Sequence, residues 1–162
     1  MGILDDDMKD DRARLIELLT RAYWMEIETV MSYITNSINP DGVRAQEIIE
    51  SLEQDIQEEL GHAREFGARI KELYGVVPGS LDFQAEQTYL QPPDEQTDIV
   101  HVIKGVIEAE SGAIEHYNEI IEFCEGRDPV TQDMVIAILR DEEGHRRLFE
   151  GFLREYKAEG LA

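Results

Sequence analysis

Two short segments of the sequence carry the same pattern of carboxylate and imidazole side chains. Residues 59–66 and 142–149 both read E-x-G-H-x-R-x-F, so a histidine, His62 or His145, follows the leading glutamate by three residues. On a helix, side chains with this spacing lie on one face. Carboxylate oxygen and imidazole nitrogen together are ligands that suit iron or manganese. Each segment therefore indicates half of a metal site.

A further glutamate lies upstream of each segment, within its own apolar helical pattern. Glu26 precedes Glu59 by 33 residues, and Glu110 precedes Glu142 by 32. All four lie where a helix would bury an apolar side chain, and burying four ionised carboxylates together without a counter-charge is very costly. Two divalent cations would balance the four negative charges. The repeat therefore predicts a pseudo-twofold dimetal site formed by Glu26, Glu59, His62, Glu110, Glu142 and His145.

The alternative for these residues is a buried network of hydrogen bonds in a helical bundle that binds no metal. A single E-x-x-H pair would not decide between the two, because 23 glutamates in 162 residues produce such a pair readily by chance. Two pairs, each inside an eight-residue repeat and each with an upstream glutamate, favour the metal site.

Four side chains beside the predicted site are candidates for holding its ligands in place. Glu58 and Asp141 each precede a histidine by four residues and could accept the imidazole N–H of the histidine on the opposite helix pair. The alternative for both is a solvated surface acid. Tyr33 and Tyr117 each follow an upstream glutamate by seven residues and could donate a hydrogen bond to the glutamate of the other pair. Their alternative is simple aromatic packing in the core.

Other polar residues are expected to lie outside the site. Surface positions are predicted for Glu28, Asp55, His101, Glu108 and His116. For Asp55, one helical turn before the glutamate of the first repeat, binding of a transient third metal is the alternative. Packing alone is expected for Cys124, and a core or interface position for Trp24.

Four segments with helical periodicity would position these residues. They cover about residues 10–38, 43–74, 98–125 and 129–157, with apolar side chains recurring at intervals of three and four. Turn residues at 39–42 and 126–129 make two short connections, and residues 76–97 make a long one that could contain a short helix around 80–88. Short connections join antiparallel neighbours, whereas a long one can cross the bundle. The prediction is an all-α fold, an antiparallel four-helix bundle with one long crossover between its second and third helices, in a single domain spanning 1–162.

The composition excludes several classes of function. Aspartate and glutamate number 36 against 15 lysines and arginines, which gives a formal net charge of −21. Because such a chain repels phosphate backbones, DNA binding is not expected. The sequence holds no apolar run of the length that spans a bilayer, so no membrane association is expected. A single cysteine and an acidic first segment, where a signal peptide would be basic and then apolar, predict a cytoplasmic protein.

With these residues in place, the chain resembles the ferritin superfamily over about residues 14–156. It is most similar to bacterioferritins and to Dps-like mini-ferritins with a bacterioferritin-type centre. Residues 138–145, Ile-Leu-Arg-Asp-Glu-Glu-Gly-His, are very similar to the last helix of bacterioferritins, and residues 107–110 with 126–129 are similar to the Dps-like branch. The resemblance implies a di-iron site in which Glu26 and Glu110 are the terminal ligands and Glu59 and Glu142 the bridging ligands. It also implies that His62 and His145 are the two imidazole ligands.

The resemblance also implies an activity. It is that of a ferroxidase, which oxidises Fe(II) with O₂ or H₂O₂ and stores or detoxifies iron in a protein cage, with two iron ions per chain or manganese as the alternative metal. Haem is not expected, because Leu60 stands where haem-binding bacterioferritins carry the axial methionine. A 12-subunit cage is favoured over a 24-subunit one, because the 48 residues from His62 to Glu110 exceed the spacing of bacterioferritin-type 24-mers.

Two other readings remain open at this point. A non-storing dimetal redox enzyme, such as a peroxidase, a catalase-like protein or an oxygenase, would use the same ligands. A structural bundle without metal is the third. The choice between O₂ and H₂O₂ as oxidant stays open as well.

Overall fold

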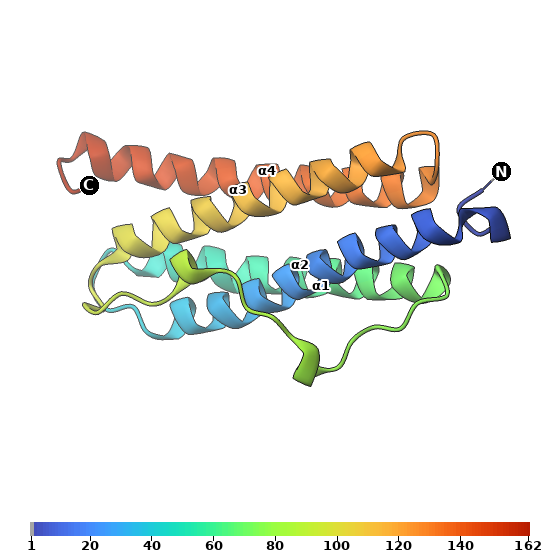
Figure 1. Ribbon diagram of the computed structural model, residues 1–162. Helices are drawn as coiled ribbons and strands as arrows, with labels where there is room; N and C mark the ends of the chain where they lie inside the picture. Colours follow the sequence, from blue (N-terminus) through green and yellow to red (C-terminus); the bar gives the residue numbers. More distant parts are fainter. Residues whose placement is uncertain (1) are drawn as a thin grey trace.

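Four long helices make up most of residues 2–162, which are the residues that the structure, a computed structural model, describes (Figure 1). They are α1 (Lys9–Ile38), α2 (Gln46–Glu72), α3 (Ile99–Cys124) and α4 (Pro129–Ala158). Three short 3-10 helices accompany them: η1 (Asp6–Met8), η2 (Ser80–Asp82) and η3 (Thr88–Leu90). No strand occurs in this part of the chain, so the predicted all-α class is confirmed.

The helices form two antiparallel pairs that lie against each other. α1 packs mainly on α2 and α3 on α4, while α1 and α3 make the broadest contact between the pairs. After α2 the chain returns along the whole length of the bundle, past α1, before α3 begins (Figure 1). The predicted four-helix bundle with one long crossover is therefore confirmed, and every helix in the described residues is too short or too polar to cross a membrane.

Two local differences from the predicted elements have clear backbone causes. α2 begins at Gln46, later than predicted, because Gly42 takes a φ of 109° and Ala45 N–H closes a turn on the Gly42 carbonyl. This turn leaves Val43 fully exposed. The short helix expected around residues 80–88 is instead two separate 3-10 turns, η2 and η3, with irregular chain between them.

Two apolar clusters fill the bundle on either side of its middle. The first contains, among others, Leu19, Phe66, Ile120, Cys124 and Ile138. The second contains, among others, Leu52, Leu90, Ile103, Val106 and Phe149. Burying one such side chain stabilises the fold by about 1.5–3 kcal/mol. These clusters therefore hold the four helices together on both sides of the polar residues in the middle of the bundle. Cys124 is buried by packing, as predicted.

A buried ion pair joins the two helix pairs at one end of the bundle. Nη2 of Arg69, on α2, donates to both carboxylate oxygens of Asp128 at 3.0 Å, and its Nε donates to the Thr131 hydroxyl at 2.8 Å. The same Asp128 carboxylate caps α4 by accepting from the backbone N–H groups of Val130 and Thr131. One carboxylate thus both starts α4 and ties it to α2.

We expect Asp128→Ala to lower the free energy of unfolding by about 3–5 kcal/mol. The reason is that Arg69 would lose its buried counter-charge and keep only the exposed carboxylate of Glu72, and α4 would lose its N-cap. Urea unfolding of the metal-free protein measures the change. Asp133→Ala removes an exposed acid from the same helix and serves as the control; equal unfolding midpoints for the two variants would contradict a stabilising role for the pair.

The crossover is fixed to α1 by a buried carboxylate, which corrects the surface position predicted for Glu28. Glu28 is 2% exposed, and its oxygens accept the backbone N–H groups of Glu86 at 2.8 Å and Gln87 at 2.9 Å. The Gln87 side chain then donates to the hydroxyl of Thr29 at 2.8 Å. The prediction was wrong because the crossover covers this face of α1, and the pattern along one helix does not report what covers it.

The surface position predicted for His116 is wrong for a related reason. Its ring is buried between α3 and α1, where Nε2 donates to the Leu18 carbonyl at 2.8 Å. Burial lowers the pKa of His116, so the ring is neutral in this position. His101 and Glu108 are exposed as predicted, and Trp24 is half-buried.

Candidate metal centre

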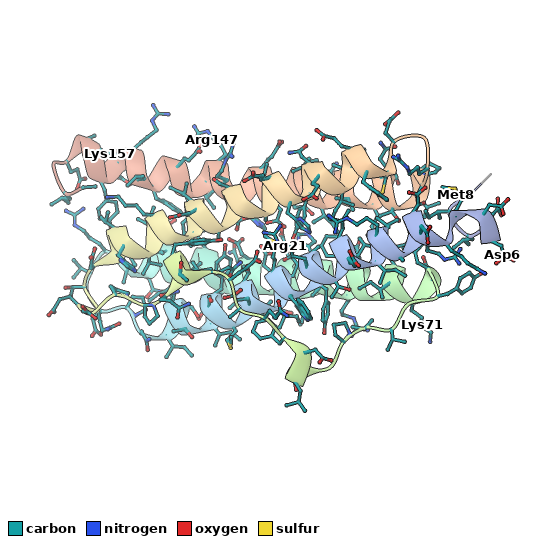
Figure 2. The ribbon with its side chains drawn as sticks, in the orientation of Figure 1. Asp6, Met8, Arg21, Lys71, Arg147 and Lys157 are labelled. Atoms are coloured by element: carbon teal, nitrogen blue, oxygen red, sulfur yellow. The ribbon has the colours of Figure 1, made fainter. Side chains whose placement is uncertain are left out.

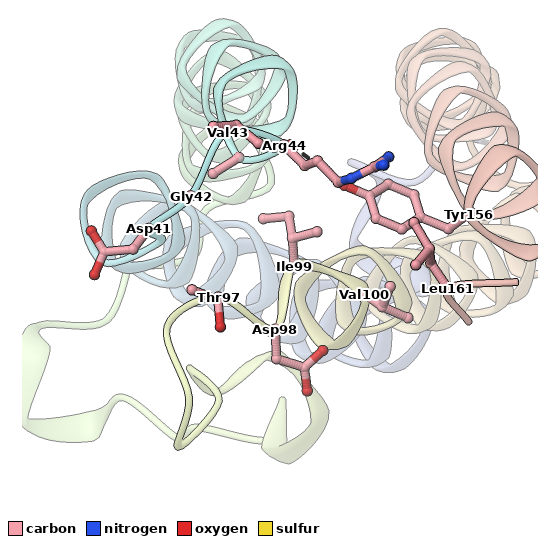
Figure 3. A pocket seen from close by; sticks show the side chains of 11 residues that line it. Asp41, Gly42, Val43, Arg44, Thr97, Asp98, Ile99, Val100, Tyr156 and Leu161 are labelled. Carbon is pink, nitrogen blue, oxygen red and sulfur yellow. Dashed lines mark hydrogen bonds between the residues drawn. The ribbon is translucent and has the colours of Figure 1, made fainter. Parts of the chain in front are cut away.

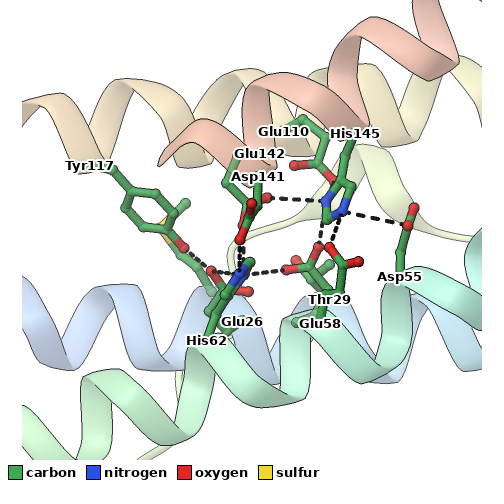
Figure 4. Close-up of polar contacts among 12 residues, drawn as sticks. Glu26, Thr29, Asp55, Glu58, His62, Glu110, Tyr117, Asp141, Glu142 and His145 are labelled. Carbon is green, nitrogen blue, oxygen red and sulfur yellow. Dashed lines mark hydrogen bonds and ion pairs between the residues drawn. The ribbon is translucent and has the colours of Figure 1, made fainter. Parts of the chain in front are cut away.

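All six predicted site residues are buried and lie together in the bundle, and Figure 4 labels all of them except Glu59. Each of the four helices contributes one glutamate, and α2 and α4 add one histidine each. The set is Glu26 from α1, Glu59 and His62 from α2, Glu110 from α3, and Glu142 and His145 from α4. We call these six residues the centre.

The centre consists of two overlapping groups of atoms that could bind a metal ion. In each group, one oxygen or nitrogen atom from each of four residues lies within 4.8 Å of the other three. The His62 group comprises Glu26, Glu59, His62 and Glu142, and the His145 group comprises Glu59, Glu110, Glu142 and His145. Because Glu59 and Glu142 belong to both groups, their carboxylates lie between the two positions.

No lysine or arginine within the described part of the chain, residues 2–162, balances these carboxylates. Lys71, Arg147 and Lys157 point outward from the bundle (Figure 2). Among residues 2–162, no lysine or arginine forms an ion pair with any of the four central glutamates, and their cationic partners are the two histidines alone.

Several atoms of the centre are buried and lack a hydrogen bond within the described chain. They are Nδ1 of both histidines and one carboxylate oxygen each of Glu59, Glu110 and Glu142. His62 Nδ1 lies 2.8 Å from a Glu142 oxygen and His145 Nδ1 lies 3.0 Å from a Glu59 oxygen, close but outside hydrogen-bond geometry. Buried polar atoms normally have partners. Atoms that converge in this way fit two divalent cations, and the mixture of oxygen and nitrogen suits iron or manganese.

Each histidine is held from the solvent side by an acidic residue of the opposite helix pair. His62 Nε2 lies 3.2 Å from an Asp141 oxygen, and His145 Nε2 lies 2.9 Å from a Glu58 oxygen (Figure 4). Nε2–H therefore donates outward, and Nδ1 faces the centre. The predicted contacts of Glu58 and Asp141 are confirmed, although both acids are also partly exposed to solvent.

The two buried tyrosines make the crossed hydrogen bonds that the repeat predicts. Tyr33 of α1 donates to Glu110 of α3, and Tyr117 of α3 donates to Glu26 of α1. Burial, followed by the neighbouring carboxylates, raises the pKa of both phenols, so they remain protonated donors. Each tyrosine therefore orients one carboxylate across the interface between the helix pairs.

Because the four carboxylates of the centre lie close together, the pKa values of two of them are raised and those of the other two are lowered. Burial, with the charges of Glu59 and Glu142 in addition, raises the pKa of Glu26 and Glu110 well above the usual range. Burial acts in the same direction on Glu59 and Glu142, but close contacts with protonated neighbours, one glutamic acid and both histidines in each case, outweigh it and lower the pKa of both. In the metal-free protein we therefore expect Glu26 and Glu110 to be neutral acids and the shared pair to be ionised.

The imidazoles hold protons for the same reason. Burial alone would lower the pKa of His62, but the carboxylates of Glu142 and Glu59 outweigh it and raise this pKa to about 10. Burial also acts to lower the pKa of His145, but the carboxylates of Glu142 and Glu59 again outweigh it and raise this pKa even more than that of His62. Two imidazolium ions then neutralise the two ionised carboxylates, and the metal-free centre carries no net charge.

Asp55 departs from its predicted surface position. Its side chain is 6% exposed, Oδ1 lies 3.5 Å from His145 Nε2, and burial raises its pKa to about 7. The prediction was wrong because α4 covers this face of α2. Its spacing of one helical turn before Glu59 was the signal that could have placed it beside the centre.

A separate pocket of about 330 Å³ lies at the end of the bundle, where the α1–α2 turn meets the start of α3 and the end of α4 (Figure 3). Arg44 lies across one side of it, over the ring of Tyr156, and pairs with Glu159 at 2.6 Å. None of its lining residues belongs to the centre, and none carries a buried polar atom that lacks a partner within residues 2–162. The pocket therefore does not compete with the centre as the candidate site.

Comparison with known proteins places the chain in a family. Residues 16–158 match the Ferritin-like domain. The DNA protection during starvation protein of Pyrococcus furiosus is 33% identical over 148 residues, which cover 88% of this chain and 78% of that protein. Bacterioferritin of Desulfovibrio desulfuricans is 25% identical over 143 residues, covering 88% and 75% respectively.

The solved structures agree with this match. A dodecameric thioferritin, the bacterioferritin-related protein of Bacteroides fragilis, has a TM-score of 0.85 and 27% identity over 92% of this chain and 89% of its own. The matched residues include all six of the centre and nearly the whole length of the four helices that position them. The chain belongs to the ferritin-like family.

Proposed function

We propose that this chain is a ferroxidase that binds two Fe(II) ions, oxidises them with O₂ or H₂O₂, and stores or detoxifies the iron in a protein cage. The observation that carries the proposal is the pair of four-residue ligand groups that share Glu59 and Glu142. Carboxylates shared in this way would hold two Fe(II) ions close enough to act on one oxidant molecule. The iron pair, when bound, supplies the two electrons that such an oxidant takes up together.

The remaining residues of the centre would hold this pair in place. Glu26 and Glu110 each belong to one group only, and the tyrosine of the opposite helix pair keeps each carboxylate oriented. His62 and His145 present Nδ1 inward because their Nε2 atoms are held by outer acids. The apolar clusters on both sides exclude bulk water and keep these side chains from rearranging.

The proposal extends to metal, assembly and location. We propose two iron ions per chain, with manganese as the alternative metal, and no haem, since Leu60 offers no axial ligand. The Bacteroides fragilis relative is described as dodecameric, which supports a homo-oligomeric cage of 12 subunits rather than 24. The net charge of −21 argues against a DNA-binding surface. A single buried cysteine suits a reducing cytoplasm.

Native mass spectrometry of the protein, first loaded with Fe(II) without oxygen and then exposed to O₂ or H₂O₂, tests this function. We expect a 12-subunit assembly with two iron ions per chain before oxidation and many more after repeated additions. A dimer that binds two ions but accumulates no further iron would favour the non-storing redox enzyme. Protein that binds no iron would overturn both and leave the structural bundle.

A further inference from the structure

Gln87, a buried residue of the crossover, reaches α1 beside the centre. It is 1% exposed, and its backbone N–H donates to Glu28 at 2.9 Å. Its side-chain Nε2 donates to the hydroxyl of Thr29 at 2.8 Å and to the Met25 carbonyl at 3.4 Å. Because a carbonyl only accepts hydrogen bonds, the NH₂ group of Gln87, and not its amide oxygen, faces α1. The Thr29 hydroxyl is therefore the acceptor in its contact with Gln87.

This contact leaves the proton of the Thr29 hydroxyl without an acceptor among residues 2–162. The one hydrogen bond that the hydroxyl makes there is the bond it accepts from Gln87. Thr35, on the same helix, differs, because its hydroxyl donates back to the Met31 carbonyl at 3.1 Å. Threonines inside helices commonly make this bond to the carbonyl four residues earlier. For Thr29 that carbonyl belongs to Met25 and already accepts from Gln87, so the proton points elsewhere.

Thr29 lies on the face of α1 that carries the centre. It follows Glu26 by three residues and precedes Tyr33 by four, and residues with these spacings share one side of a helix. It is 7% exposed, and Figure 4 shows it among the side chains of the centre. Several carboxylate oxygens of the centre are buried and have no donor in the described chain. A free donor and free acceptors thus lie in the same buried region.

The second helix pair has no matching hydroxyl. The counterpart of Thr29, three residues after Glu110, is Ala113, which packs in the first apolar cluster. The hydroxyl is therefore absent from the pattern that the two halves of the centre share, and it belongs to neither group of atoms that could bind a metal ion. This asymmetry indicates a task other than holding a metal ion.

We propose that Thr29 donates a hydrogen bond to the small oxidant molecule at the centre, and that Gln87 keeps the hydroxyl turned toward it. This inference rests on the proposed function. Thr29 is then a group that touches the substrate, and Gln87 is a positioning residue that acts through Thr29.

A free hydrogen-bond donor is what the centre otherwise lacks within the described residues. Its carboxylates are acceptors only when they bind metal, and the two buried tyrosines already donate to Glu110 and Glu26. An oxidant that takes up electrons gains negative charge, and a fixed donor aimed at that charge stabilises it. The Thr29 hydroxyl supplies such a donor.

Azide binding to the Co(II)-loaded protein tests this role without any oxidation, because azide accepts hydrogen bonds and its binding changes the visible absorption of Co(II). With two Co(II) bound per chain, we expect Thr29→Val to weaken azide binding about three- to tenfold, the effect of one lost hydrogen bond. Thr29→Ser keeps the hydroxyl and should bind azide as the wild type does. The matched control is Thr35→Val, which removes a hydroxyl that is bonded to its own helix.

Combined variants test the role of Gln87. Gln87→Leu removes the NH₂ group, so the Thr29 proton can turn to the Met25 carbonyl, and we expect weaker azide binding in this variant too. Adding Gln87→Leu to Thr29→Val should weaken azide binding no further. This lack of additivity distinguishes action through Thr29 from two independent structural effects. Thr29→Ala and Gln87→Met provide second variants, and the melting temperature of each variant confirms that it is folded.

The outcomes separate this inference from the proposed function. Equal azide affinities for Thr29→Val and Thr35→Val would overturn the inference, while two Co(II) per wild-type chain would uphold the dimetal centre. Fewer Co(II) in Thr29→Val would make the hydroxyl part of metal binding and also overturn it. A wild-type Co(II) spectrum that azide leaves unchanged would show that no small ligand reaches the metal pair, with the same result. Wild-type protein that binds no metal pair would remove the basis of both.

Discussion

Replacing Glu59 by alanine is expected to lower the rate of Fe(II) oxidation by more than about a hundredfold. Removing a residue that only supports a metal ligand already costs roughly 10–100-fold in affinity or activity. Glu59 belongs to both ligand groups, so its loss affects both metal positions at once. The variant also takes away the partner that His145 Nδ1 approaches at 3.0 Å. No other carboxylate of the centre can reach both positions from α2.

Stopped-flow absorbance after mixing Fe(II)-loaded protein with O₂ or H₂O₂ measures this rate. Glu65→Ala is the matched control, because it removes an exposed glutamate from the same helix. Circular dichroism should show an intact helical bundle in both variants, since the apolar clusters lie outside the change. Oxidation by the Glu59 variant at the rate of the control would show that the two ligand groups do not act as one centre.

Metal binding is expected to become tighter with pH and to release about four protons per chain near neutrality. Two of these protons come from Glu26 and Glu110, whose pKa values are raised, and two from the imidazolium forms of His62 and His145. The ligands must be carboxylates and neutral imidazoles when metal is bound. Since one proton is worth about 1.4 kcal/mol per pH unit, binding of the pair should gain up to about 5 kcal/mol for each unit of rising pH.

The stability of the metal-free protein should change in the opposite direction. The pKa of His62 is raised from 6.5 to about 10, so its contribution to stability is full below pH 6.5 and is lost as the pH rises toward 10. Glu26 and Glu110 keep protons that the unfolded chain releases above about pH 4.5, which also lowers stability as the pH rises. The difference in melting temperature between metal-bound and metal-free protein should therefore widen with pH.

Calorimetry at several pH values between about 6 and 8, with Mn(II) or with Fe(II) under anaerobic conditions, measures this difference. Titration in buffers of different ionisation enthalpy counts the released protons directly. A melting temperature that metal leaves unchanged at every pH would mean that the six residues form only a polar core. A metal effect that does not vary with pH would contradict the proton count.

Local spacing was enough to predict that the six residues of the centre lie together, and on which helices. The i, i+3 separation of Glu59 and His62 puts both on one helix face whatever surrounds the helix. The repeat then related the second pair, Glu142 and His145, to the first. Even contacts between helix pairs, such as Tyr33 with Glu110, followed from the repeat, because a pseudo-twofold arrangement brings each element opposite its counterpart.

Burial of the other polar residues depended on contacts between segments far apart in the sequence. Glu28 is covered by the crossover 58 residues later, His116 by α1, and Asp55 by α4. The apolar periodicity of its own helix places each of these residues on the solvent-facing side or at the edge of the buried face. The sequence by itself therefore determined the helices, their order and the six residues of the centre, since these depend on periodicity and local spacing. Only the tertiary structure decided which of the other polar residues are buried, because that depends on which distant segment covers each helix face.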